Sequence, residues 1–134
     1  MIGAKLGQVL IGVVGLFDAG AGVALLVAPD WFYANIGEFP PFNRHYAGDA
    51  GAFLLPIGVG LLIAAGNPQR FGSIIGLGLA ATWLHALNHT YDAVFNAGQG
   101  QASLLDAGMI LGMALALTLG TMLSRTATNA RIAR

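Results

Sequence analysis

Residues 71–95 have the sequence FGSIIGLGLAATWLHALNHTYDAVF, which is apolar at first and then carries two histidines and a carboxylate. On a helix, His85, His89 and Asp92 take positions i, i+4 and i+7, which lie on one face. Such polar side chains are costly in hydrocarbon unless they are paired, hydrated or bound to a ligand. Their presence in this segment therefore needs a physical explanation.

The composition of the whole chain is that of a membrane protein. Of its 134 residues, 56% are hydrophobic and 9% are charged, and the mean hydropathy is +0.70. Four apolar segments, 6–28, 45–65, 71–95 and 102–123, are each near the roughly 20 residues that cross a bilayer. All should be helices, because lipid leaves unpaired backbone groups unsatisfied. We predict an all-α, four-helix transmembrane bundle of up-down topology, with residues 1–134 as a single integral membrane domain.

Several function classes are excluded by the residue content. The chain has no cysteine, which excludes disulfides, thiolate metal sites and thiol nucleophiles. Its six basic and six acidic residues give a net charge of zero, so there is no footprint for nucleic acid. No glycine-rich loop follows a strand, so nucleotide binding is not predicted.

The connections and small residues suggest how the segments pack. Residues 29–44 are rich in aromatic side chains, and we expect a short amphipathic piece or cap at the membrane interface. Asn43 is a candidate N-cap for the second helix. Gly58 and Gly60 should permit close helix packing, and Gly108 and Gly112 have contact spacing.

The distribution of basic residues predicts the orientation in the membrane. Lys5, Arg70 and the arginines of the tail that begins at Ser124 lie on one side, whereas Arg44 lies alone on the other. By the positive-inside rule, both termini are cytoplasmic. The first segment also has features of a cleavable signal peptide, but we expect it to be retained.

Seven ionisable residues are predicted to share the outer, non-cytoplasmic half of the bundle. They are Asp18 in the first segment, His45 and Asp49 in the second, His85, His89 and Asp92 in the third, and Asp106 in the fourth. The inner half has no such residues. We therefore predict a polar cavity that opens toward, or is covered on, the outer face.

Three imidazoles with several carboxylates form a ligand set suited to zinc, iron or copper. We predict His45, His85 and His89 as ligands, with Asp49 as a ligand or as an acceptor that orients an imidazole. Asp92 belongs to the same predicted site. Further candidates are Asp18 and Asp106. A haem held by His45 together with His85 or His89 is the alternative cofactor.

A structural interpretation of the same residues stays open. Histidines and aspartates near helix ends can hydrogen-bond to one another, to Arg44 or to interfacial water, and so fix the register of the helices. In that case the cluster has no ligand.

Two motifs, Asn43-Arg44-His45-Tyr46-x-x-Asp49 and His85-Ala86-Leu87-x-His89-x-x-Asp92, together resemble small bacterial four-helix membrane proteins of the DoxX-like kind. The resemblance covers roughly residues 43–123. It implies an integral protein of the bacterial cytoplasmic membrane with no secure activity. Some DoxX-like proteins are associated with quinone or sulfur oxidation complexes, which implies a role beside a redox enzyme. Thiol-dependent chemistry cannot be carried over to a chain without cysteine.

Two functions of different classes follow from the sequence. The first is a transition-metal site that supports redox chemistry on a lipophilic substrate such as a quinone. The alternative is a non-catalytic accessory subunit of a larger membrane complex, whose short loops and small-residue faces serve packing. A carrier or channel is disfavoured because only half of the thickness is polar.

Overall fold

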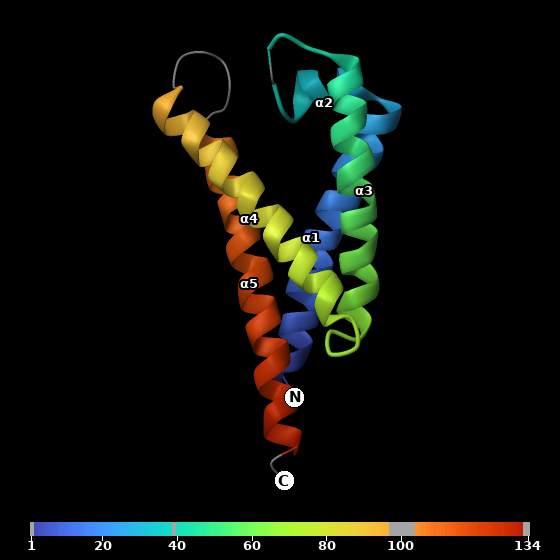
Figure 1. The fold of residues 1–134 in the computed structure, drawn as a ribbon, viewed down its shortest axis with the longest axis vertical. Coiled ribbons are helices and arrows are strands. Elements are labelled where there is room, and N and C mark those ends of the chain that lie inside the picture. Colours follow the sequence, from blue (N-terminus) through green and yellow to red (C-terminus); the bar gives the residue numbers. More distant parts are fainter. Residues whose placement is uncertain (1, 39, 97–103, 133–134) are drawn as a thin grey trace.

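The computed structural model describes residues 2–38, 40–96 and 104–132, and this part of the chain is all-α, with no strand. Its five helices are α1 (Ile2–Val27), α2 (Pro29–Asn35), α3 (Arg44–Gly66), α4 (Gly72–Phe95) and α5 (Leu104–Ile132) (Figure 1). The predicted all-α class is confirmed.

The helix boundaries agree with the prediction for α3 and α4 and differ at both ends of the chain. The first helix begins at Ile2 rather than at residue 6, and α5 continues to Ile132 rather than ending at residue 123. No glycine or proline follows Gly120, so nothing in the tail breaks the helix. The predicted start at residue 102 and the predicted break at 98–101 lie outside the described residues.

Three helices in the described part of the chain are long and apolar enough to cross a membrane: Ile2–Val27, Arg44–Gly66 and Leu104–Arg125. This finding indicates membrane association. Many large hydrophobic side chains point outward, including Leu16, Leu84 and Phe53, as expected for helices in contact with lipid. Although α4 is 24 residues long, it is not among the three, because its second half is polar.

The helices pack tightly at the end that carries both termini and the turn between α3 and α4, which we call the closed end (Figure 1). A buried cluster there joins all four long helices: Ile11, Val14, Leu61, Ala64, Ile75 and Leu117. Gln8 Nε2 also donates to the carbonyl of Gly66 (3.3 Å), and Gln69 Nε2 donates to that of Ser124 (3.1 Å). These hydrogen bonds tie the start of α1 and the middle of α5 to the turn.

Glycines bring the backbones of α1 and α3 into contact over most of their length. A Cβ added at Gly15 would lie 2.9 Å from the carbonyl oxygen of Gly58, and one added at Gly51 would lie 2.8 Å from that of Gly22. A Cβ at Gly58 would collide with the backbone of Ala19. The predicted close packing at Gly58 is therefore confirmed.

Gly60 also packs as predicted, because a Cβ there would lie 3.0 Å from Cγ2 of Ile74 on α4. For Gly108 and Gly112 the prediction of a helix contact is wrong. Within the described part of the chain, no atom of another helix lies within 4 Å of a Cβ added at either position. The glycine of α5 that packs against another helix is Gly120. A Cβ added there would lie 3.0 Å from the carbonyl oxygen of Gly7 on α1.

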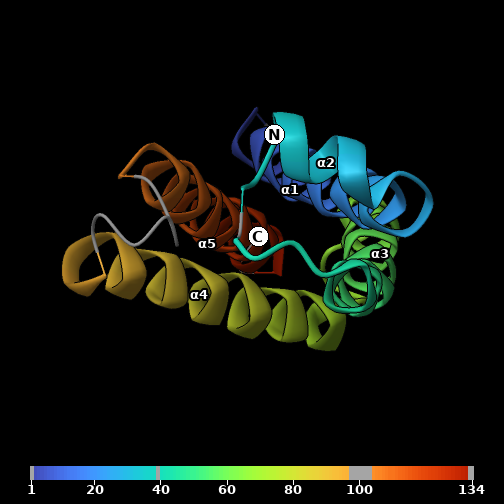
Figure 2. The same cartoon turned by 90° about the horizontal axis from the view of Figure 1, so that it is seen from above.

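At the other end, which we call the open end, the helices separate. Near their shared turn α3 and α4 are in contact, since a Cβ at Gly78 would lie 2.8 Å from Leu61. Beyond this contact the two helices diverge, as both views show (Figures 1 and 2). The short helix α2 lies at the open end, within the connection that was predicted to form a short amphipathic piece or cap, and its place at a membrane interface stays a prediction.

Candidate ligand-binding pocket at the open end

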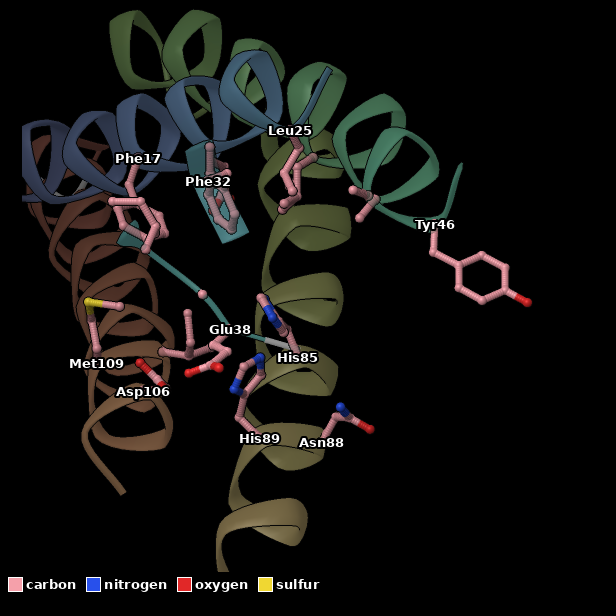
Figure 3. A pocket seen from close by; sticks show the side chains of 18 of the residues that line it. Phe17, Leu25, Phe32, Glu38, Tyr46, His85, Asn88, His89, Asp106 and Met109 are labelled. Carbon is pink, nitrogen blue, oxygen red and sulfur yellow. The ribbon is translucent and has the colours of Figure 1, made fainter. Parts of the chain in front are cut away.

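A cavity of about 380 Å³, which we call the outer pocket, lies between the diverging helices and is lined by residues from all five (Figure 3). Its volume is within the range of small-molecule sites. Its walls are apolar, with Phe17, Leu25, Phe32 and Ile110 among the lining residues. Its histidine and acidic residues are Asp18, Glu38, His85, His89, Asp92 and Asp106. Five of the seven predicted site residues therefore share this cavity.

The histidine pair comes from successive turns of α4. The rings of His85 and His89 meet edge to face, with centroids 4.6 Å apart and an interplanar angle of 66°. Nδ1 of His89 is buried, and no described residue forms a hydrogen bond with it. A buried polar atom without a hydrogen-bond partner costs free energy, so a ligand that hydrogen-bonds to Nδ1 of His89 would be stabilised there.

The second half of α4 is held against α5 by both polar and apolar contacts. Nε1 of Trp83 donates to Oγ1 of Thr118 (3.1 Å), and Ala86 packs with Ile110 and Ala114 in a second buried cluster. These contacts fix the rotation of α4. Because His85 and His89 both lie on the same side of Ala86 around the helix, this rotation turns both rings toward the outer pocket.

Two carboxylates face the histidines from other elements. In Figure 3 the side chains of Glu38 and Asp106 turn toward His85 and His89 across the pocket. Asp106 was predicted from its place near the start of the fourth segment. Glu38 was missed, because it lies in an irregular segment after α2 where no periodicity assigns a face. It is the only glutamate in the chain, and this was the one available signal.

Asp92 lies at the edge of the pocket and already has partners. Its Oδ1 accepts a hydrogen bond from Nδ2 of Asn96 (2.9 Å), and its Oδ2 accepts a longer one from Nδ2 of Asn88 (3.5 Å). In Figure 3, Asn88 points away from the histidines. Asp92 is thus held by amides of its own helix.

Asp18 is the most buried ionisable residue of the pocket, with 6% of its surface exposed. It lies in the middle of α1, between Gly15 and Gly22, where α3 comes closest. No hydrogen bond or ion pair to Asp18 occurs among the described residues. An intramembrane carboxylate without a partner is a candidate functional group.

Asp18 also lines a second cavity of about 250 Å³, which we call the side cavity. This cavity lies between α3 and α4, and most of its lining is apolar. Its residues are Asp18, Ala50, Phe53, Leu54, Ile57, Ala81, Thr82, His85, Ile110 and Met113. The two cavities share Asp18, Ala50, Leu54, His85 and Ile110, so they adjoin each other beside Asp18 and His85.

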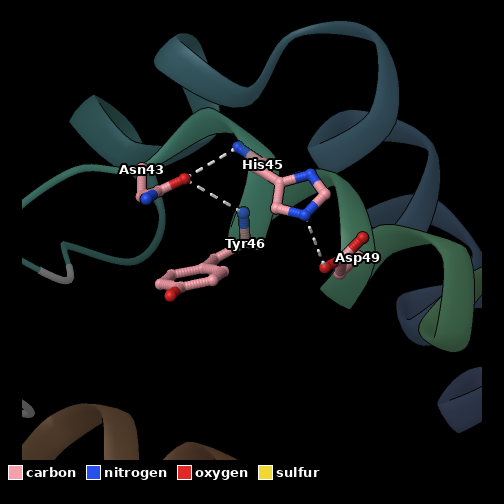
Figure 4. A network of polar contacts seen from close by, with 4 residues as sticks. All are labelled: Asn43, His45, Tyr46 and Asp49. Atoms are coloured by element: carbon pink, nitrogen blue, oxygen red, sulfur yellow. Dashed lines mark hydrogen bonds and ion pairs between the residues drawn. The ribbon is translucent and has the colours of Figure 1, made fainter.

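His45 and Asp49 line neither cavity. They form an exposed pair at the start of α3, with 3.6 Å between Nε2 and Oδ2 and side-chain exposures of 80% and 58% (Figure 4). Asn43 caps the helix as predicted, since its side chain accepts from the backbone N–H of His45 (2.9 Å). The inward face of α3 is that of Ala47, which is buried, so His45 and Asp49 lie elsewhere on the helix. Both the predicted metal ligand set and the haem pair require His45 to lie close to His85 or His89. The structure does not bring these residues together.

The charge of the outer pocket has one sign. Four of the six acidic residues of the chain line it, and none of its described lining residues is lysine or arginine. Arg44, at the same end of the molecule, is exposed and does not line the cavity. The pocket therefore suits a positively charged group better than an anion.

Among the residues that the structure describes, no three His, Asp or Glu side chains are grouped closely enough to hold a metal ion. Comparisons with protein-family models, with curated proteins and with solved structures gave no match. The DoxX-like resemblance therefore stays a prediction.

Proposed function

We propose that this chain is an integral membrane protein in which α1, α3, α4 and α5 all cross the bilayer in up-down order. Both termini would be cytoplasmic. Figure 1 supports this arrangement, because the N- and C-termini lie together at the closed end. Lys5, Arg70 and Arg125 belong to segments at that end, in accordance with the positive-inside rule. The polar half of α4 is compatible with a membrane span because it lines the outer pocket.

The function that the geometry supports best is the binding of an amphiphilic small molecule in the outer pocket. The observation that carries this proposal is the gathering of six ionisable side chains from α1, α4, α5 and the segment after α2 around one apolar-walled cavity. The polar part of the ligand would lie against His85, His89 and the carboxylates. Its apolar part would lie against Phe17, Phe32 and their neighbours.

Tryptophan fluorescence provides a test with a built-in reporter. The chain has two tryptophans, and Trp83 packs in the same cluster as the pocket residues Phe17 and Ile110. In a Trp31→Phe protein in nanodiscs, three amphiphiles with the same chain, decylamine, decanol and decyl sulfate, would be titrated against empty nanodiscs. We expect at least one to change the Trp83 emission saturably.

Filling the pocket distinguishes site binding from partition into lipid. Ala21 lines the outer pocket, whereas Ala52 is exposed and lines neither cavity. Ala21→Phe should abolish the saturable signal, and Ala52→Phe should leave it unchanged. Identical titrations in the two variants would contradict the proposal.

A transition metal is the second candidate, favoured by the paired rings of His85 and His89 and the unpartnered Nδ1 of His89. These histidines would hold zinc, iron or copper, and Glu38 and Asp106 are the carboxylates turned toward them (Figure 3). A bound redox metal would support electron transfer to a lipophilic substrate such as a quinone.

Metal analysis of protein extracted from its native membrane tests this candidate. We expect the metal to be lost in a His85→Ala, His89→Ala double variant and retained in His45→Ala, since His45 lies outside the pocket. Stoichiometric metal that survives the double variant would contradict the assignment. Absence of both metal and amphiphile binding, with a co-purifying membrane protein, would favour the accessory-subunit alternative.

A further inference from the structure

We propose that the ligand of the outer pocket is a lipophilic organic cation, whose charged nitrogen pairs with Asp18 and which enters from the bilayer between α3 and α4. This inference rests on the proposed amphiphile-binding function and adds to it the charge of the ligand, its counter-ion and its route.

The sign of the charge follows from the lining of the pocket. Asp18, Glu38, Asp92 and Asp106 surround the cavity, and no lysine or arginine is among the described lining residues. Charges at the edge of a low-dielectric cavity reinforce one another, so a cation gains from all four carboxylates and an anion is repelled by them. Phe17 and Phe32 add aromatic surface that can lie against an ammonium group.

Asp18 is the most buried of these four carboxylates. It is 6% exposed, lines both cavities, and has no hydrogen bond or ion pair within the described residues. Asp92, by contrast, is held by two asparagine amides. A buried carboxylate is stabilised strongly by a hydrogen-bonded cation, so an amine at the junction of the two cavities would satisfy Asp18 where the protein does not.

The route follows from the shape of the side cavity. It lies between α3 and α4, which are in contact near their turn and diverge toward the open end (Figures 1 and 2). Its apolar residues include Phe53, which is 73% exposed, and Ile57 and Ala81, which are half-buried. An alkyl chain arriving from lipid would meet apolar side chains first and Asp18 last.

The amphiphile series that tests the proposed function also tests the charge. In nanodiscs of neutral lipid, and after correction for partition into empty nanodiscs, decylammonium should bind at least about tenfold more tightly than decanol, because a charge-assisted hydrogen bond is added. Decyl sulfate should not bind. Equal binding of decanol and decylammonium would overturn the inference while leaving the proposed function intact, provided that Ala21→Phe abolishes both.

The counter-ion is tested by a pair of matched substitutions. Asp18→Asn should remove the preference for decylammonium over decanol, and Asp49→Asn, which neutralises an exposed carboxylate outside both cavities, should keep it. A preference that persists in Asp18→Asn would overturn the assignment of Asp18. If Asp18→Asn does not fold, Asp18→Glu is the deciding variant. It keeps the negative charge, so it should keep the preference for decylammonium. Loss of that preference in Asp18→Glu would contradict a simple ion pair.

The route is tested by the rate of binding. Ala81 lines the side cavity and not the outer pocket, so Ala81→Phe should slow the association of decylammonium from the bilayer. Ala80→Phe, at an exposed position that lines neither cavity, is the control. Equal association rates in the two variants would exclude entry between α3 and α4.

Discussion

The closed and open ends of the molecule are built from the same four long helices, yet they differ in packing density and in charge. At the closed end, side chains such as Leu61 and Leu117 are completely buried. At the open end, the helices diverge around a cavity that holds most of the acidic residues of the chain. The close packing of one end fixes the helix directions, so the other end can stay open without collapsing.

Substitutions at the two ends should therefore differ in their effects on stability and on ligand binding. At the closed end, a change in side-chain volume should alter the stability of the protein. Ligand binding should then fall only in proportion to the loss of folded protein. At the open end, a change of charge or volume should alter binding with little loss of stability.

The largest effect is expected at the contact between α1 and α3. Gly58→Leu places a side chain against the backbone of Ala19, and neither helix can move without opening the core, so we expect a loss of about 3 kcal/mol or more. Gly112→Leu, at a position with open space around it, is the matched control. Thermal unfolding followed by circular dichroism in detergent measures both. Equal melting temperatures would show that the α1–α3 contact does not hold the fold together.

Truncation of a leucine at each end should separate the two regions next. Leu61→Ala removes a side chain with 0% exposure and should cost about 3 kcal/mol through the cavity it leaves. Leu54 already lines both cavities, so Leu54→Ala enlarges an existing space and should cost less. Equal losses in the same unfolding experiment would mean that the open end is as well packed as the closed end.

A smaller effect of opposite sign is expected at Asp18. Replacing this unpaired, buried carboxylate with an apolar residue, Asp18→Leu, should raise the stability of the ligand-free protein by about 1 kcal/mol while removing the preference for decylammonium over decanol. Asp49→Leu, on an exposed residue, should change neither property by much. Destabilisation by Asp18→Leu would indicate that Asp18 has a structural role rather than a ligand.

The smallest effect is expected for the exposed pair at the start of α3. His45→Ala removes a 3.6 Å ion pair between largely exposed side chains, so stability should change by no more than about 0.5 kcal/mol. Binding in the outer pocket should be unchanged, in contrast to His85→Ala. A clear loss of binding in His45→Ala would place this histidine in the site after all.

Much of the architecture was predictable because apolar length and helix breakers are local properties. The central segments begin and end close to the predicted residues, and Asn43 is the cap that its residue type indicated. The face of each helix was harder to predict. Lipid and protein core are both apolar, so periodicity gives little information, and Gly58 and Gly112 look alike in the sequence although only Gly58 lies in a contact.

The site shows the same limit. His45 with Asp49 and His85 with His89 have identical i, i+4 spacing, yet the first pair is exposed and the second lies in the pocket. What separates them is the rotation of each helix, set by distant contacts such as the hydrogen bond from Trp83 to Thr118. Glu38 reaches the pocket only through the path of an irregular segment, which no spacing rule describes.

The accessibility of single cysteines would test the central claim most directly, because the natural chain has none and each introduced thiol is unique. Ala21 lines the outer pocket, and Ala64 is completely buried at the closed end. In intact membrane vesicles, a membrane-impermeant thiol reagent added on the non-cytoplasmic side should modify Ala21→Cys rapidly and Ala64→Cys hardly at all. An unreactive Ala21→Cys, or equal rates at the two positions, would contradict a ligand pocket open at one end of the bundle.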